Sequence, residues 1–265
     1  MQTTKTKKQS AALATKPAAG KTALATNTAI NYAADAGKGL EGADKSSYAI
    51  PFITVLQGLS PQLEIVDGAK PGLLINTITN ELSNGLQVIP CAFQRRYLRW
   101  TPRDQGGGYK GELHPADVET NKVPGLTKDA DGHFKIGEDE LKDTRNHFVL
   151  VRNGAGQWQP ALLSLSSTQL RKSKRWMSRI SSIEMKDANG QLFTPPSFSH
   201  IYQVTTVKEE NDKGAWWGIE INLAGPVTDA DLYAKAKQFS RSVSSGEVET
   251  APPPPPDEAA ANKKF

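Results

Sequence analysis

Basic and aromatic side chains alternate through residues 88–111, a stretch that starts as an apolar run and ends at three consecutive glycines. Guanidinium groups can neutralise phosphates, flat rings can stack on bases, and glycines let a backbone adapt to a ligand. The pattern therefore predicts part of a groove for a single-stranded nucleic acid. The candidate contacts in this stretch are Arg95, Arg96, Tyr97, Arg99, Trp100, Arg103, Tyr109 and Lys110.

The formal net charge of +4 is small, but the charged residues are segregated along the chain. Residues 95–110 carry five basic side chains against one acidic, and residues 171–186 carry six against one. Residues 112–145 show the opposite bias, with nine acidic side chains against five basic. This segregation predicts two basic surfaces that attract a polyanion and one acidic surface that repels it.

A second group of candidates lies on a predicted helix at residues 168–183, where apolar residues recur at helical spacing. Its other faces would carry Arg171, Lys172, Lys174 and Arg175, either as phosphate contacts or as an ordinary solvated surface. Trp217 is a further stacking candidate. Because Trp216 and Trp217 are adjacent in a predicted strand, they face opposite ways, and one of them is expected to be exposed.

The remaining residues do not suggest catalysis. The four histidines lack the spacing of metal ligands, and neither a nucleophile elbow nor a phosphate loop is present. Residues 127–138 match a calcium loop only in part, so a polar turn is favoured there. We therefore expect no enzymatic activity, no cofactor and no metal.

Cysteine content and hydropathy indicate the cellular compartment in which the protein is found. Cys91 is the only cysteine, which excludes an internal disulfide and predicts a buried thiol in a reducing environment. No stretch of about 18 apolar residues could span a membrane. We expect a soluble, cytoplasmic protein.

Composition divides the chain into three parts. Residues 1–45 and 242–265 are poor in large apolar side chains, and the second of these segments contains five consecutive prolines. Such segments cannot bury enough surface to offset the entropy of ordering. They are predicted to be a disordered basic N-terminal arm and a disordered proline-rich C-terminal tail around one folded domain at residues 46–241.

The order of elements predicts the fold of that domain. A strand at 86–98, a hairpin at 147–165, the basic helix and a hairpin at 201–223 give three strands, a helix and two strands. This is the order of a five-stranded oligonucleotide-binding barrel, a mainly β fold with α, whose helix lies between strands three and four. We expect an additional N-terminal hairpin that pairs 73–79 with 86–98, and an acidic insertion at 112–145.

Strand alternation constrains the first group of candidates. In a regular strand Tyr97 shares a face with Arg95 and Arg99, whereas Trp100 shares the other face with Arg96. The two rings can line one groove only if the strand bulges near Arg95 or if Trp100 already lies in the following loop.

Several short blocks resemble single-stranded DNA-binding proteins of tailed bacteriophages. They are Ile50-Pro51-Phe52, Leu56-Gln57, Leu59-Ser60-Pro61, Pro71-Gly72, Asn76-Thr77, Val88-Ile89-Pro90, Trp100 and Gly106-Gly107-Gly108. The resemblance implies a barrel of this type that protects and organises single-stranded DNA during replication or recombination in an infected bacterium. The alternative is a phage structural or host-takeover module that binds proteins and no nucleic acid.

The C-terminus is similar to the partner-recruiting tails of such proteins, which end in phenylalanine. Here Phe265 follows Lys263 and Lys264, whereas the family pattern has acidic residues at the tip. The resemblance implies partners among phage replication or recombination proteins, and the two lysines could instead address an acidic patch, as on host RNA polymerase.

Overall fold

The computed structural model describes residues 30–43, 47–212, 214–248, 250 and 253. The chain divides into two units, Met1–Ala43 and Asp44–Phe265. In the first unit, the described residues include a short 3-10 helix, η1 (Tyr32–Asp35), and an ion pair between Lys38 and Asp35. Most of the predicted N-terminal arm and most of the predicted C-terminal tail, including Lys263, Lys264 and Phe265, lie outside the described residues.

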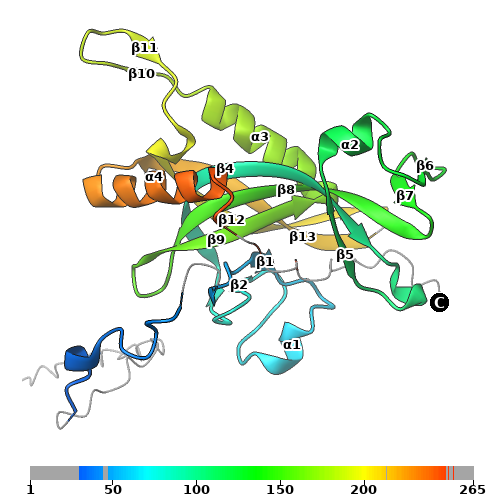
Figure 1. The fold of residues 1–265 in the computed structure, drawn as a ribbon, viewed down its shortest axis with the longest axis horizontal. Coiled ribbons are helices and arrows are strands. Elements are labelled where there is room, and N and C mark those ends of the chain that lie inside the picture. Colours follow the sequence, from blue (N-terminus) through cyan, green and yellow to red (C-terminus); the bar gives the residue numbers. More distant parts are fainter. Residues whose placement is uncertain (1–29, 44–46, 213, 249, 251–252, 254–265) are drawn as a thin grey trace, which may run out of the picture. The chain divides into compact units, whose positions relative to one another are not determined.

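An eight-stranded, curled antiparallel sheet is the centre of the second unit (Figure 1). Its five principal strands pair in the order β9–β8–β4–β12–β13. Their bounds are β4 (Gly85–Trp100), β8 (Asp139–Arg152), β9 (Trp158–Ser166), β12 (His200–Asn211) and β13 (Gly214–Pro226). The predicted order of three strands, a helix and two strands is therefore found, and a mainly β fold with α is confirmed.

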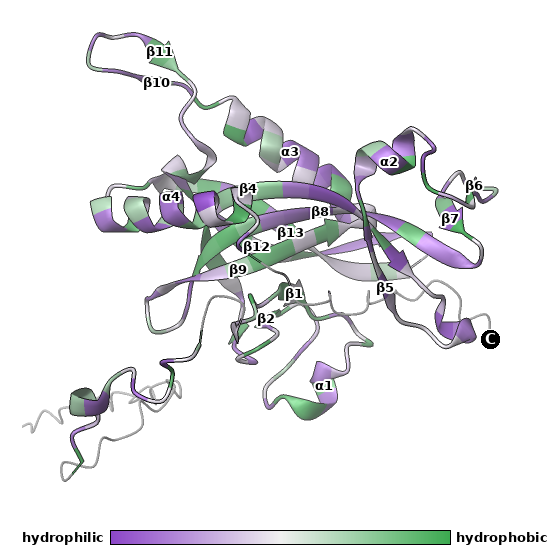
Figure 2. Ribbon diagram, in the orientation of Figure 1, coloured by the Kyte–Doolittle hydropathy of each residue, from purple (hydrophilic) through white to green (hydrophobic). Residues whose placement is uncertain are grey.

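Both faces of this sheet are covered, which explains the continuous apolar runs in β4 and β8. Val149 and Val151 pack on one face with residues of α3 (Leu170–Ser181), whereas Phe148 and Leu150 pack on the other face with α4 (Ala230–Ser244). Cys91 lies in the second cluster, where burial raises its pKa to about 12. Figure 2 shows the hydrophobic residues gathered on the central strands and many hydrophilic residues along α3.

The two helices begin and pack as their sequences require. In α3, Ser173, Trp176 and Ile180 are buried at spacings of three and four residues, so one stripe of the helix faces the sheet. In α4, the Asp229 carboxylate caps the first turn by accepting hydrogen bonds from two backbone amides. The opposite surface of α3 is left to solvent.

The prediction that residues 73–79 pair with residues 86–98 in an N-terminal hairpin was wrong. A separate three-stranded sheet forms from β1 (Ile53–Val55), β2 (Leu74–Asn76) and β3 (Leu82–Ser83), in the order β1–β2–β3. The chain between β1 and β2 contains a single helical turn, α1 (Gln62–Ile65). Strand β4 cannot accept β2, because its two edges are already paired with β12 and β8.

Among the described strands, β9 and β13 do not pair directly, and the segment around β1 lies between them. Phe52 forms a parallel bridge with Leu162 on β9. On the other side, the Gln57 amide donates to the backbone carbonyl of Trp217 and accepts from its backbone N–H, each at 2.8 Å. Gln169 and Arg179 bind further backbone groups of β13, at Ile219 and Ile221. Side chains thus satisfy an edge that would otherwise be exposed.

The predicted acidic insertion is shorter than expected and is folded. The last seven residues of the predicted insertion, 139–145, belong to β8, so the segment that connects β4 to β8 ends at residue 138. It contains β5 (Tyr109–Leu113), α2 (Pro115–Glu119), β6 (Leu126–Lys128) and β7 (Phe134–Ile136). Val118 packs with Tyr97 and Leu141 in a small core of its own. We call residues 112–138 the acidic extension.

A two-stranded hairpin projects from the sheet beyond the end of α3 (Figure 1). It pairs β10 (Met185–Lys186) with β11 (Leu192–Phe193). The chain then passes a 3-10 turn, η5 (Ser197–Ser199), and returns to the sheet in β12. Within the described part of the chain, no helix is long and apolar enough to cross a membrane.

Candidate nucleic-acid interface

The arginines at the end of β4 are held by carboxylates. Arg95 makes two hydrogen bonds to Asp143, at 2.9 and 2.8 Å, and a third to Glu119 of α2 at 2.5 Å. The Asp143 contact, aided by Glu119 and opposed by desolvation, raises the pKa of Arg95. The guanidinium charge is neutralised within the chain, so a phosphate would have to displace these carboxylates.

The neighbouring arginines are paired in the same way. Arg96 bonds to Glu112 at 2.9 Å, and Arg99 lies 2.6 Å from Asp139. Asp139 also accepts a hydrogen bond from Thr101, and these contacts lower the pKa of its carboxyl group. The acidic extension and the start of β8 therefore neutralise the three arginines that the sequence offered as phosphate contacts.

The two rings of this stretch are buried, which contradicts the expectation that they are free to stack. Tyr97 is 6% exposed and packs edge-on against Phe134, while Trp100 is 8% exposed and contacts the ring of Tyr109. The register between β4 and β8 runs unbroken from Ala92 to Trp100, so the two rings point to opposite faces. The bulge imagined near Arg95 lies instead between Pro90 and Ala92.

The glycine loop that follows β4 has the backbone conformation and the exposed basic residues that the sequence predicts. Gly106, Gly107 and Gly108 all have positive φ angles, a conformation in which glycine is favoured. Arg103, in the short helix η3 (Arg103–Gln105), and Lys110 are exposed, and Tyr109 is half-buried against Trp100. Two cations of the first candidate group are thus exposed at the loop.

The solvent face of α3 is the second basic region, and three of its cations have no acidic partner among the described residues. Arg171, Lys174 and Arg175 are exposed on the side opposite the buried stripe, and none has an ion pair with another described residue. Lys172, on the flank of the helix, bonds to Glu209 at 2.6 Å, and Arg179 donates to a backbone carbonyl of β13. We call Arg171, Lys174 and Arg175 the α3 basic face.

The opposite side of α3 is anchored by a buried polar contact. His147 on β8 lies 2.7 Å from the Ser173 hydroxyl and stacks on the Trp176 ring, with centroids 4.6 Å apart. Burial, together with the charge of Arg145, lowers the pKa of His147 to about 3, so its ring is neutral at neutral pH. This contact fixes the rotation of α3 about its axis and therefore the direction of the basic face.

Neither tryptophan of β13 is fully exposed. Trp216 donates from its indole nitrogen to Glu209, the carboxylate that also holds Lys172. Trp217 lies against Gly72, where a Cβ atom would come within 2.8 Å of the indole ring. Both side chains are half-buried, so the expectation that one is core and the other exposed is not met.

Sequence reasoning missed the exposed aromatic residue next to α3. Phe193 and its cross-strand partner Met185, on the β10–β11 hairpin, are 43% and 40% exposed. A signal for this hairpin was present in Asn189-Gly190, a turn sequence flanked by apolar residues.

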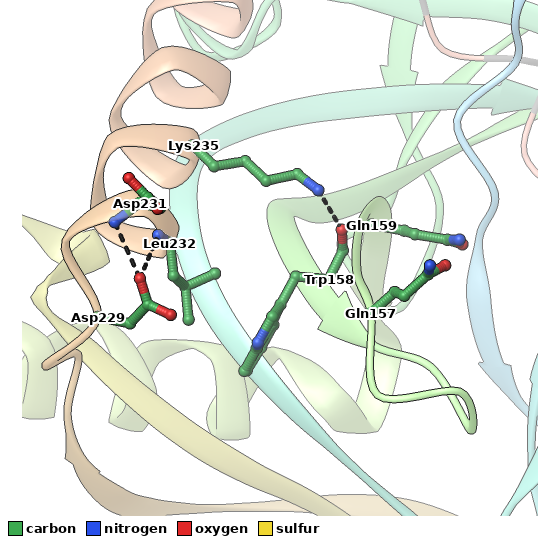
Figure 3. A pocket seen from close by; sticks show the side chains of 7 residues that line it. All are labelled: Gln157, Trp158, Gln159, Asp229, Asp231, Leu232 and Lys235. Carbon is green, nitrogen blue, oxygen red and sulfur yellow. Dashed lines mark hydrogen bonds between the residues drawn. The ribbon is translucent and has the colours of Figure 1, made fainter.

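A pocket of about 500 Å³ lies where the start of β9 meets α4. Trp158, Leu232 and Lys235 line it, with Gln157, Gln159, Asp229 and Asp231 (Figure 3). The Lys235 ammonium donates to the backbone carbonyl of Trp158, and Asp229 caps the helix. Lys235 thus links α4 to β9, whereas Asp229 is engaged within its own helix.

The histidines and carboxylates of the described residues have mainly structural contacts. No group of three histidine, cysteine or carboxylate side chains there could hold a metal ion. The turn at residues 129–133 is built by the Asp129 carboxylate, which accepts backbone hydrogen bonds from Asp131 and His133. The close pair of His147 and Ser173 is buried and has no access to a substrate.

The fold and the candidate site define a mainly β protein with a curled antiparallel sheet and a basic helix packed against one of its faces. A family model described as Pam3 phage gp34-like protein matches residues 19–249. The chain belongs to this phage protein family. Comparison with curated proteins and with solved structures found no match.

Proposed function

We propose that this protein binds single-stranded DNA with little sequence preference, during phage replication or recombination in the infected cell. The observation that carries the proposal is the α3 basic face, where three exposed cations on one side of a helix have no partner among the described residues. Neutralised phosphates contribute most of the affinity in sequence-tolerant binding. Arg103 and Lys110 at the glycine loop are secondary contacts in this proposal.

The strand order supports the proposal. The pairing β9–β8–β4–β12–β13, with α3 between β9 and β12, is that of an oligonucleotide-binding barrel except for the closing contact between its third and fifth strands. We propose that the segment around β1 completes the barrel by bridging β9 and β13 through Phe52 and Gln57. Membership of a phage family fits this role.

The part of the proposal that concerns the C-terminal residues is based on the sequence alone. Lys263, Lys264 and Phe265 are proposed to recruit a phage replication or recombination protein, or host RNA polymerase. Neither a catalytic reaction nor a cofactor forms part of the proposal.

The test is a fluorescence titration of the full chain, which has five tryptophans, with single-stranded and duplex oligonucleotides of equal length. We expect tighter binding to the single strand, and an affinity that falls as salt rises with a slope of about 0.7 per phosphate contact. Equal affinity for both forms, or no binding at low salt, would contradict the proposal. The second result would favour a protein-binding role. The exposed Leu59, just before α1, and Ile65, at its end, would then be the first surface to test.

A further inference from the structure

The β10–β11 hairpin continues directly from the helix that carries the basic face. Only residues 182–184 separate the end of α3 from β10, and the hairpin extends away from the sheet (Figure 1). Its cross-strand pairs are Met185 with Phe193 and Lys186 with Leu192. Because paired residues share a face of a hairpin, Met185 and Phe193 form one apolar surface.

The tip of the hairpin is pre-organised. The Asp187 carboxylate accepts hydrogen bonds from the backbone amides of Asn189 and Gln191, each at 2.8 Å. The Asp187 backbone bonds to those of Gly190 and Gln191 at 3.0 Å, and Gly190 adopts the positive φ that the turn requires. An isolated two-stranded hairpin is only marginally stable in water, so this turn chemistry holds a shape that the short strands alone would not.

The apolar surface of the hairpin is open to solvent. Met185 and Phe193 are exposed on this face and Leu192 is exposed on the other face of the hairpin, whereas Tyr97 and Trp100 are buried. Exposed apolar residues grouped on a projecting element mark a binding surface. Phe193 is therefore an exposed ring on the element that directly follows α3 in the chain.

The charged residues near the Met185–Phe193 surface indicate which kind of ligand it binds. The exposed charged residues on and beside the hairpin are Glu184, Lys186 and Asp187, and Asp187 is engaged with the backbone of the tip. The hairpin follows directly on the helix that carries the α3 basic face, and that face calls for an anionic ligand. A ligand that is anionic along its backbone and presents flat apolar groups matches both surfaces, and single-stranded nucleic acid has this chemistry.

We infer that Phe193 and Met185 form a stacking platform for the bases of a single strand whose phosphates lie along the α3 basic face. This inference rests on the proposed function and adds the site at which bases are held. A phenyl ring and a flexible thioether can adapt to any base, so the platform has no sequence preference.

The test compares Phe193→Ala, Phe193→Leu and Phe193→Trp in the full chain, by titration with a single-stranded oligonucleotide at low salt. Loss of the ring should weaken binding about tenfold in the alanine and leucine variants, because stacking contributes roughly that factor per base. The tryptophan variant should bind as the unmodified protein does and show additional quenching. Ile65→Ala, which removes an exposed apolar side chain at the end of α1, is the matched control and should bind normally.

The outcomes separate this inference from the function on which it rests. If all Phe193 variants bind normally while loss of the α3 basic face abolishes binding, the platform is refuted and the function stands. If the unmodified protein does not bind single strands, both fail. If Phe193→Ala alters self-association in sedimentation without changing affinity per protomer, the hairpin is a contact between copies of the chain and the platform is again refuted.

Discussion

The end of β4 and the helix α3 carry similar numbers of basic residues, yet they present them in opposite ways. Arg95, Arg96 and Arg99 are each bonded to a carboxylate of the acidic extension or of β8. Arg171, Lys174 and Arg175 of α3 have no such partner among the described residues. The comparison teaches that a basic run indicates a binding surface only if the fold leaves its charges unpaired.

The largest expected effect in this comparison concerns stability at the end of β4. Trp100→Ala should lower the free energy of unfolding by about 3 to 5 kcal/mol, because truncating a buried tryptophan leaves a cavity. Denaturant unfolding measures the change. The exposed Phe193→Ala should shift stability by no more than about 0.5 kcal/mol. An unchanged midpoint for Trp100→Ala would mean that this ring is not part of the core.

A second prediction concerns the buried contact beneath α3. The pKa of His147 is lowered to about 3 in the folded protein, against about 6.5 in an unfolded chain. Between these values the unfolded chain binds the extra proton, so stability should fall as pH falls, by up to about 1.4 kcal/mol per pH unit. His147→Gln should remove this component.

Unfolding free energies at pH 7 and pH 5 measure the component. The difference between the two pH values should be smaller in His147→Gln than in the unmodified protein, whatever the variant's stability at pH 7. Equal differences in the two proteins would show that His147 is accessible to protons in the folded state, and would remove the anchor that we assign to α3.

The smallest expected effect concerns the surface ion pair of Arg96 and Glu112, whose side chains are partly exposed. A double-mutant cycle with Arg96→Gln and Glu112→Gln should give a coupling energy of about 0.2 to 1 kcal/mol in stability. Neither single variant should change the affinity for single-stranded DNA. Weaker binding by Arg96→Gln, without loss of stability, would show that Arg96 contacts the DNA.

Much of the fold could be predicted because its signals are local. Apolar runs bounded by turn residues gave the strands, and the spacing of Trp176 and Ile180 gave the inner stripe of α3. The pairing of β1 with β2, and the use of Gln57 to satisfy the edge of β13, could not be predicted, since these contacts join residues far apart in sequence.

The candidate site was harder to predict for the same reason. Whether Arg95 is free depends on Asp143 and Glu119, which reach it only when the acidic extension folds back on β4. Segregation of charge in the sequence suggested that basic residues 95–110 and acidic residues 112–145 form separate surfaces. Opposite charges in neighbouring segments also attract each other, however, and here they pair. The unpaired state of α3 likewise became visible only in the structure.

The most direct test of the central claim removes the α3 basic face and compares it with an equal loss of charge elsewhere. The triple variant Arg171→Gln, Lys174→Gln, Arg175→Gln should bind single-stranded DNA at least about tenfold more weakly, with a salt slope lower by about 2 for three lost contacts. The matched variant Lys70→Gln, Lys237→Gln, Arg241→Gln, at exposed positions outside α3, should bind almost normally. Equal losses in the two variants would show that net charge, and not this face of α3, determines binding.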